Sequence, residues 1–234
     1  RAGEATLDQT LEDDPRFDPA TSTRTFTLAT TDYVATILAG PLMRALAETA
    51  PGVTLDIRSV PEAEVEGQLA RSELDVAISP PAPALDGLMR RRLLDDGFAC
   101  LVREGHPRVG KRLSLATYVA LQHALISPQG SGTSIVDRLL TERGLARHVA
   151  LRVQSFVTAP LVVAESDLIL TAPTLLVRTF ARHAGVRVLP PPLSVPRFTV
   201  YSFWHQRVER DPAHTWLRAR LVDAAVLASR AKAG

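Results

Sequence analysis

The sequence has little of several things that would reveal its chemistry. Its 234 residues include one cysteine, Cys100, which excludes an internal disulfide and any zinc site built from several cysteines. No run approaches the roughly 18–20 apolar residues that a membrane-spanning helix needs, so no membrane partner is expected. The 27 basic residues are balanced by 25 acidic ones, and only Lys111 and Lys232 are lysines. A chain so close to neutral lacks the excess of positive charge that attracts a polyanion. We therefore expect these residues not to bind nucleic acid themselves.

Metal and catalytic patterns are also missing. There is no His-Glu-x-x-His segment, no His-x₃-His pair, and no histidine beside acidic residues at metal-ligand spacing. Cys100 lies in an apolar segment, which predicts a buried, unreactive thiol without a positioned base. We therefore expect no metal, no cofactor and no enzymatic activity. The histidines are interpreted as surface or capping residues: His106, His123, His148, His183, His205 and His214.

What the sequence does contain is an alternation of short β-rich and helical segments, in an ordinary globular composition of 46% hydrophobic and 22% charged residues. This rhythm predicts an α/β fold with open parallel or mixed sheets. Before it, Leu7 and Leu11 indicate the end of a helix, and 16–23 reads as a linker. The expected strands are 26–30, 53–58, 74–78, 88–93, 98–102, 124–127, 149–153, 168–171, 186–189 and 197–204.

The expected helices are 34–50, one starting at Pro61, 114–121, 134–144, 156–165, 173–184 and a last one from Pro212 with Asp211 as its N-cap. Pro41 should kink or restart the first of them. Two strand–helix blocks, joined near 95–97 and again near 192–197, fit two lobes. The final β run and the last helix are expected to return to the first lobe.

Three junctions after strands carry candidate binding residues. The loop 127–133 (SPQGSGT) combines hydroxyls with Gly130 and Gly132, which let a backbone approach a ligand. It lacks the ending of a phosphate loop and is no nucleophile elbow, so a tight turn with an N-cap is the alternative reading. Thr30, Thr31 and Asp32 follow the first strand, where Asp32 is expected to cap the next helix. Ser155 and Phe156 form the third junction, with Ser155 a cap and Phe156 a core residue.

Several segments, in order, resemble the effector-binding domain of LysR-type transcriptional regulators. The segments are 17–50 followed by Pro51, 72–78 (SELDVAI), 103–107 (REGHP), 155–169, 203–205 (FWH), 210–214 (RDPAH) and 216–218 (WLR). The resemblance covers about residues 7–228 and is strongest to the branch of nodulation regulators and of regulators that respond to salicylate and nitroaromatic compounds.

The resemblance implies a two-lobed fold like that of type 2 periplasmic binding proteins, each lobe a mixed sheet flanked by helices, with two hinge crossings. Residues 1–23 would be the tail of a linker helix and a linker. Residues 24–96 with 197–234 would form lobe I, and 97–196 lobe II. The family's winged helix-turn-helix would lie upstream, so DNA would be a partner only through that missing domain. A cytoplasmic protein, working as a homodimer or a dimer of dimers, is implied.

The resemblance also implies a small-molecule effector, an aromatic compound being one class, in the cleft between the lobes. Some aromatic-acid-responsive relatives place histidines at the positions of Thr133 and Ser155, where this chain has hydroxyls. Salicylate-like specificity is therefore not implied. The cleft-lining positions are Thr30, Thr31, Ser59, Val60, Ser127, Gly132, Thr133, Ser155, Phe156 and Phe203.

Two rival functions remain at this stage. A solute-binding protein of a transporter has a similar fold and predicts a secretion signal and a monomer. A two-lobed enzyme would use the same cleft, but no convergent acid, base, nucleophile or metal set is visible.

Overall fold

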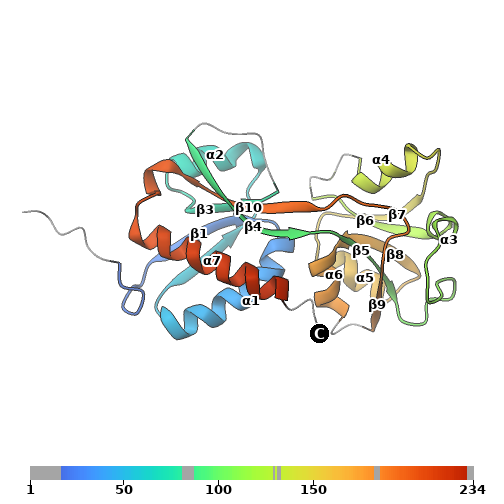
Figure 1. Cartoon of the computed structure of the whole chain (residues 1–234), viewed down its shortest axis with the longest axis horizontal. Helices are drawn as coiled ribbons and strands as arrows, with labels where there is room; N and C mark the ends of the chain where they lie inside the picture. Colours follow the sequence, from blue (N-terminus) through green and yellow to red (C-terminus); the bar gives the residue numbers. More distant parts are fainter. Residues whose placement is uncertain (1–16, 81–86, 129, 131–132, 182–184, 231–234) are drawn as a thin grey trace, which may run out of the picture.

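Two five-stranded sheets lie side by side along the long axis of the molecule (Figure 1) in the computed structural model, which describes residues 17–80, 87–128, 130, 133–181 and 185–230. We call the parts of the chain around them the first and the second lobe. The first sheet has the order β2-β1-β3-β10-β4, with β1 (Thr25–Thr30), β2 (Thr54–Arg58), β3 (Val76–Ser79), β4 (Leu88–Asp96) and β10 (Phe198–His205). The second has the order β7-β6-β8-β5-β9, with β5 (Phe98–Arg103), β6 (Gln122–Ile126), β7 (His148–Val153), β8 (Leu168–Pro173) and β9 (Val186–Leu189).

Both sheets are mixed, as the alternating pattern predicts. In the first, β1 runs parallel to β2 and β3, whereas β10 is antiparallel to β3 and β4. In the second, β6 runs parallel to β7 and β8, whereas β5 is antiparallel to β8 and β9. The pairing of β10 with β3 and β4 confirms that the final β run returns to the first lobe. The lobe limits expected from the sequence stay a prediction.

The helices occur where the apolar stripes predict them, with shifted ends. Their bounds are α1 (Asp32–Thr49), α2 (Glu62–Ala70), α3 (Leu115–Ala120), α4 (Ile135–Thr141), α5 (Thr158–Ala164), α6 (Thr174–Ala181) and α7 (Pro212–Arg230), with a 3₁₀ turn η1 (Gln206–Val208). Of the two outcomes expected at Pro41, a restart is wrong, because α1 continues through the proline as one helix, whereas a kink stays a prediction. The helix continues because one apolar stripe of buried side chains extends on both sides of the proline. The stripe includes Ile37, Leu38, Leu42 and Leu46.

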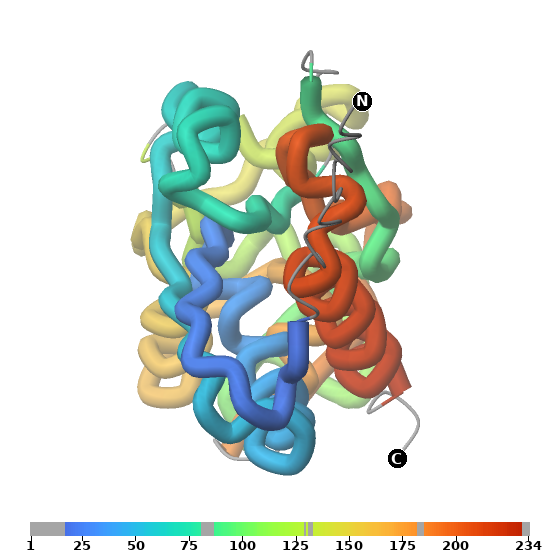
Figure 2. The backbone as a smooth tube through the Cα atoms, turned by 90° about the vertical axis from the view of Figure 1, so that its left-hand side faces the viewer, coloured from blue at the N-terminus to red at the C-terminus, as the bar shows by residue number. Residues whose placement is uncertain are grey.

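Helices cover both faces of the first sheet. On one face, α7 packs against α1 and β4 (Figure 2). The predicted N-cap of α7 is confirmed, since the amide of His214 donates to Asp211 Oδ1 at 2.9 Å. On the other face, α2 lies against β3 and β10 over a small apolar cluster. The expected helix end at Leu7 and Leu11 lies outside the described residues.

One apolar core extends through both lobes. It includes Leu28 and Val200 from the first sheet and Leu101 and Leu170 from the second, all with at most 1% of their surface exposed. Aromatic rings continue it across the boundary. The ring of Tyr33 lies 5.6 Å from that of Phe156, and the rings of Phe98 and Phe198 are 5.4 Å apart. The relative placement of the lobes is therefore held by packing as well as by the chain.

The first crossing between the lobes is fixed by Asp96, the last residue of β4. Its carboxylate is fully buried and accepts three hydrogen bonds: from Tyr33 Oη at 2.8 Å, from the amide of Gly97 at 2.8 Å and from the amide of Leu175 at 3.0 Å. Burial, followed by the adjacent Asp96, raises the pKa of Tyr33 above its ordinary value, so its phenol stays a donor. These bonds join α1, the crossing and the start of α6.

Candidate functional site

The first set of predicted binding residues lies where β1 ends. Thr30 is the last residue of β1, half-buried, and its hydroxyl donates to the carbonyl of Ile78 on β3 at 2.8 Å. Thr31 occupies the N-cap position of α1 with extended backbone angles, but its side chain makes no capping bond. Thr30 is thus tied into the sheet, whereas the hydroxyl of Thr31 is free of a capping role.

The other first-lobe residues are more scattered. Ser59 follows β2 and is exposed, whereas Val60 packs partly against the apolar cluster beneath α2. Phe203 on β10 belongs to that cluster and has 8% of its surface exposed, in contact with residues such as Leu69 and Ala77. The ring of Phe203 therefore contributes mainly to packing.

In the second lobe, the predicted loop begins at the end of β6. Ser127 is buried, and its amide donates to the carbonyl of Val153 on β7 at 2.8 Å. Gly130 has φ of +73°, and a side-chain carbon there would come within 2.9 Å of Gln154 Nε2, so the backbone does approach a neighbour closely. Thr133 is exposed, and Gly132 lies outside the described residues.

Ser155 and Phe156 lie between β7 and α5 and behave as the sequence indicates. Ser155 Oγ accepts hydrogen bonds from the amides of Val157 and Thr158, both at 3.1 Å, which is a capping arrangement. Phe156 is half-buried and packs against the main core.

Asp32 departs from its expected role. It is the first residue of α1, and the N-cap position belongs to Thr31. Instead, Asp32 Oδ2 accepts from Ser155 Oγ at 2.8 Å and from the amide of Phe156 at 2.9 Å. The carboxylate turns toward the second lobe because a hydroxyl and an amide proton lie within reach there, and such charge-assisted bonds are stronger than neutral ones. The expected cap is therefore an interlobe contact.

A buried polar cluster behind the loop was missed at the level of sequence. The side chain of Arg147, 2% exposed, donates to Asp137 Oδ1 on the first turn of α4 at 2.7 Å and to Oγ of Ser134, the N-cap of that helix, at 3.0 Å. Its Nη1 lies 3.3 Å from His123 Nδ1. Ser134 and Asp137 have the Ser-x-x-Asp spacing of a reciprocal N-terminal cap, which is a sequence signal, but nothing in the sequence points to Arg147.

Burial sets the titration of this cluster and of the cysteine nearby. Burial is the largest cause that lowers the pKa of His123, to about 4, and Arg147 adds to it. For Asp137, burial raises the pKa, but the hydrogen bonds from Arg147 and Ser134 outweigh burial and lower the pKa overall. Burial raises the pKa of Cys100 to about 11, so its thiol is protonated as expected.

The reading of all histidines as surface or capping residues is wrong for two of them. His123 and His214 are 0% and 3% exposed, on β6 and α7 respectively, because each side chain points into its lobe and finds polar partners there. His106 is also buried, although its Nδ1 does accept from the amide of Arg108 as a cap. Among the described residues, no three His, Cys, Asp or Glu side chains gather in a way that could hold a metal ion.

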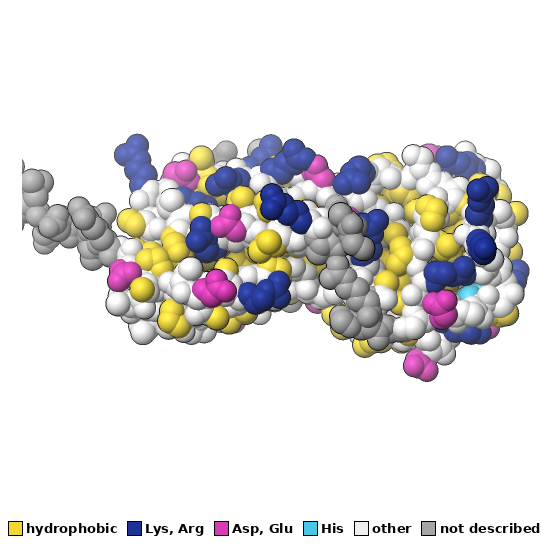
Figure 3. Space-filling view, turned by 60° about the horizontal axis from the view of Figure 1, so that its bottom comes forward, with side chains coloured by type: hydrophobic (Ala, Val, Ile, Leu, Met, Phe, Trp, Pro, Cys, Tyr) yellow, Lys and Arg dark blue, Asp and Glu magenta, His cyan; other side chains and the backbone are white. Residues whose placement is uncertain are grey.

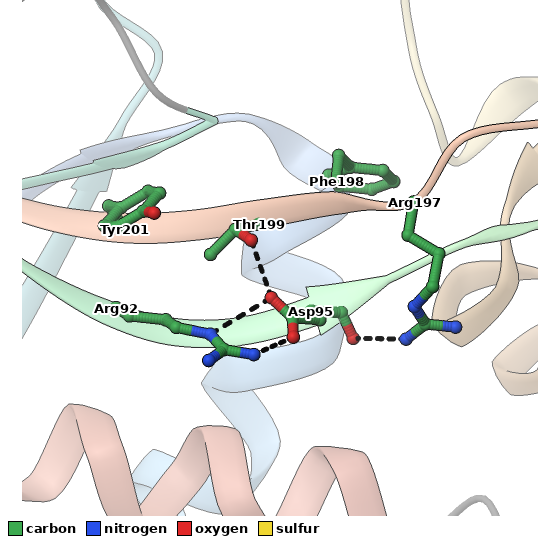
Figure 4. Close-up of a pocket in the computed structure, with 6 residues that line it drawn as sticks. All are labelled: Arg92, Asp95, Arg197, Phe198, Thr199 and Tyr201. Carbon is green, nitrogen blue, oxygen red and sulfur yellow. Dashed lines mark hydrogen bonds and ion pairs between the residues drawn. The ribbon is translucent and has the colours of Figure 1, made fainter.

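A pocket of about 340 Å³ lies beside β4 and β10 (Figure 4). Its polar groups bond to one another: the carboxylate of Asp95 accepts from the guanidinium of Arg92 and from Thr199 Oγ1. None of the predicted binding residues that the structure describes lines it. The lining residues are Arg92, Asp95, Arg197, Phe198, Thr199 and Tyr201.

The surface agrees with the near-neutral charge. Basic and acidic side chains are interspersed over the face shown in Figure 3. Arg90, Arg91 and Arg92 are exposed on β4, the edge strand of the first sheet, where solvent surrounds their charges. Within the described part of the chain, no helix is long and apolar enough to cross a membrane.

Comparison with known proteins gives one consistent family. The model of the LysR substrate binding domain matches residues 19–226. The HTH-type transcriptional activator NahR of Pseudomonas putida is 30% identical over 93% of this chain and 72% of its own length. The HTH-type transcriptional regulator SyrM of Rhizobium meliloti (strain 1021) is 34% identical over 85% of this chain, which spans only 61% of SyrM. The crystal structure of the regulatory domain of MexT, a transcriptional activator in Pseudomonas aeruginosa, is similar with a TM-score of 0.76 and 30% identity, covering 88% of this chain and all of that one.

Proposed function

The chain belongs to the LysR family of transcriptional regulators, whose substrate-binding domain it contains, and we propose that this domain senses a small-molecule effector held between its two lobes. The observation that supports this proposal is the hydrogen bond from Ser155, in the turn before α5, to Asp32 at the start of α1. This bond brings a loop of each lobe together. A ligand that touches both loops interacts differently with each interlobe arrangement. Only such differential affinity lets a ligand shift a conformational equilibrium.

The proposed site uses the polar residues at the strand ends. Thr31 from the first lobe, and Ser127 and Thr133 from the second, supply hydroxyls. Phe156 supplies an apolar wall, and Ser155 holds Asp32 where the loops of the two lobes meet. These groups suit a ligand with a small apolar body and a few hydrogen-bonding atoms. Thr133 and Ser155 stand where some aromatic-acid-responsive relatives have histidines, so an uncharged effector fits this set better than salicylate.

The response is proposed to pass to a DNA-binding domain. Relatives such as NahR and SyrM are named HTH-type regulators, and the chain covers 72% and 61% of their lengths. We propose that the helix-turn-helix lies outside this chain, that the protein acts in the cytoplasm as a homodimer or a dimer of dimers, and that the effector biases one arrangement by about 1–3 kcal/mol of coupling. Because the relatives found are regulators, a transporter's solute-binding protein and an enzyme are not favoured.

A thermal-shift screen tests the site. Aromatic acids, flavonoids and small metabolites are added to the chain, and a binder should raise the melting temperature with increasing concentration. In Thr133→Trp, the indole should fill the cleft and abolish that shift. Thr141→Trp, at the exposed other end of α4, is the control and should respond like the unmodified chain. An unchanged shift in Thr133→Trp at saturating ligand would place the effector elsewhere.

A further inference from the structure

Asp32 joins two lobes through residues 123 and 124 positions away in the chain. It begins α1 in the first lobe, and its Oδ2 is bonded by Ser155 Oγ and by the amide of Phe156 in the second. All three residues are half-buried, so a ligand entering from solvent can reach them. This contact lies among the residues proposed to bind the effector.

The two donors are oriented for a carboxylate oxygen. A serine hydroxyl has one proton and two lone pairs. The lone pairs of Ser155 Oγ accept from the amides of Val157 and Thr158, so its proton is left for Asp32. The amide of Phe156 adds a second, convergent donor. A hydroxyl and an amide proton on one oxygen form a charge-assisted pair of the kind that also holds carboxylate ligands.

The charge of Asp32 is not matched by a cation. Within the described residues, Asp32 forms no ion pair, in contrast to Asp75 and Asp137. A carboxylate ligand would therefore have to displace Asp32 from its donors and place a second negative charge beside it. An uncharged ligand has no such penalty and could donate to the remaining oxygen of Asp32.

We propose that Asp32 is a specificity-determining residue: it fills the carboxylate-binding donors of the cleft with the chain's own carboxylate. The cleft therefore takes neutral or cationic effectors that carry a hydrogen-bond donor, and it excludes carboxylates. This inference rests on the proposed function, since it concerns the ligand class of the same cleft.

The test compares benzoate with benzamide, which have the same ring and differ in charge, by titration calorimetry. In Asp32→Ala the two donors are vacated, so benzoate should bind at least about tenfold more tightly than to the unmodified chain. Benzamide affinity should not gain by that factor. Asp18→Ala is the matched control, because Asp18 also accepts from one amide and one hydroxyl, those of Ala20 and Thr21, but within a single exposed turn.

Hydrogen exchange at the amide of Phe156 gives a second readout. Exchange should be faster in Asp32→Ala than in the unmodified chain, and saturating benzoate should slow it again. If Asp32→Ala does not fold, Asp32→Asn replaces it, and removal of the charge alone should then tighten benzoate binding.

Three results overturn the proposal: equal benzoate affinity with and without Asp32, no benzoate binding to the variant, or an unchanged exchange rate at Phe156. The proposed function fails differently, through a screen in which no ligand stabilises the unmodified chain or in which Thr133→Trp changes nothing. The benzoate titration does not depend on that screen.

Discussion

The two lobes each bury a histidine close to an aspartate, with arginine nearby, but they arrange the charges in opposite ways. In the first lobe, His214 Nε2 lies 3.0 Å from Asp75 Oδ1. In the second, His123 Nδ1 lies 3.3 Å from the guanidinium of Arg147, and Asp137 pairs with that arginine at 2.7 Å. The same three residue types thus place one histidine against an anion and the other against a cation.

The position of each cluster in its lobe shows what the difference does. Asp75 also accepts from the amide of Thr27 on β1 at 2.7 Å and pairs with Arg24, so the first cluster ties the start of α7 to the sheet. The second cluster holds Ser134, directly after the candidate binding loop. The cluster around neutral, buried His123 therefore positions the start of α4 beside the proposed site. The cluster around Asp75 instead stabilises the packing of the first lobe.

The largest effect is expected from Arg147→Met. The change removes the donor that buried His123 shares with half-buried Asp137 and Ser134, so the free energy of unfolding should fall by about 3–4 kcal/mol. Urea unfolding measures it. Arg143→Met is the control, since Arg143 is exposed and donates only to a backbone carbonyl, that of Leu139. Equal losses of unfolding free energy in Arg147→Met and Arg143→Met would show that the cluster around Arg147 contributes no more than an exposed arginine.

The next effect is a pH dependence due to His123. Its pKa in the folded chain, about 4, is below the unfolded value of about 6.5, so the unfolded chain takes up the proton first. The contribution of His123 to the free energy of unfolding is complete above that unfolded pKa. It falls by about 2–3 kcal/mol as the pH decreases from the unfolded pKa to the folded one. His123→Asn should flatten the stability curve in this window. A curve that keeps its full slope in the variant would assign the effect to another group.

The smallest effect is expected from Asp75→Asn, which should lower the free energy of unfolding by about 1–2 kcal/mol at neutral pH. The loss is small because Arg24 is 36% exposed and can be solvated when its partner is neutral. Burial raises the pKa of Asp75, but the bonds from His214 and Thr27 and the charge of Arg24 outweigh it and lower the pKa. Its contribution is therefore present above an unfolded pKa of about 4 and lost below it. The stability difference between Asp75→Asn and the unmodified chain should shrink in acid. Asp223→Asn, an exposed partner of Arg220, is the control.

Much of the fold was predictable because it depends on local signals. The Asp211 cap, the apolar stripes of α1 and α7 and the buried segment around Cys100 are all legible in short windows of sequence. The Ser155 cap was predictable for the same reason, since its partners are two and three residues away. The role of Asp32 could not be predicted in this way. An aspartate at the start of a helix is predicted to cap that helix, and the sequence does not show that donors far along the chain compete for its carboxylate.

By itself, the sequence determined the alternation of strands and helices and the family, since both depend on the order and the kinds of residues. Only the tertiary structure decided which of the polar residues meet. Asp32 and Ser155, or Arg147 and Ser134, are brought together by sheet order and helix packing. Hydrogen bonds form over about 3 Å, and a distance that short is set by the fold rather than by spacing along the chain.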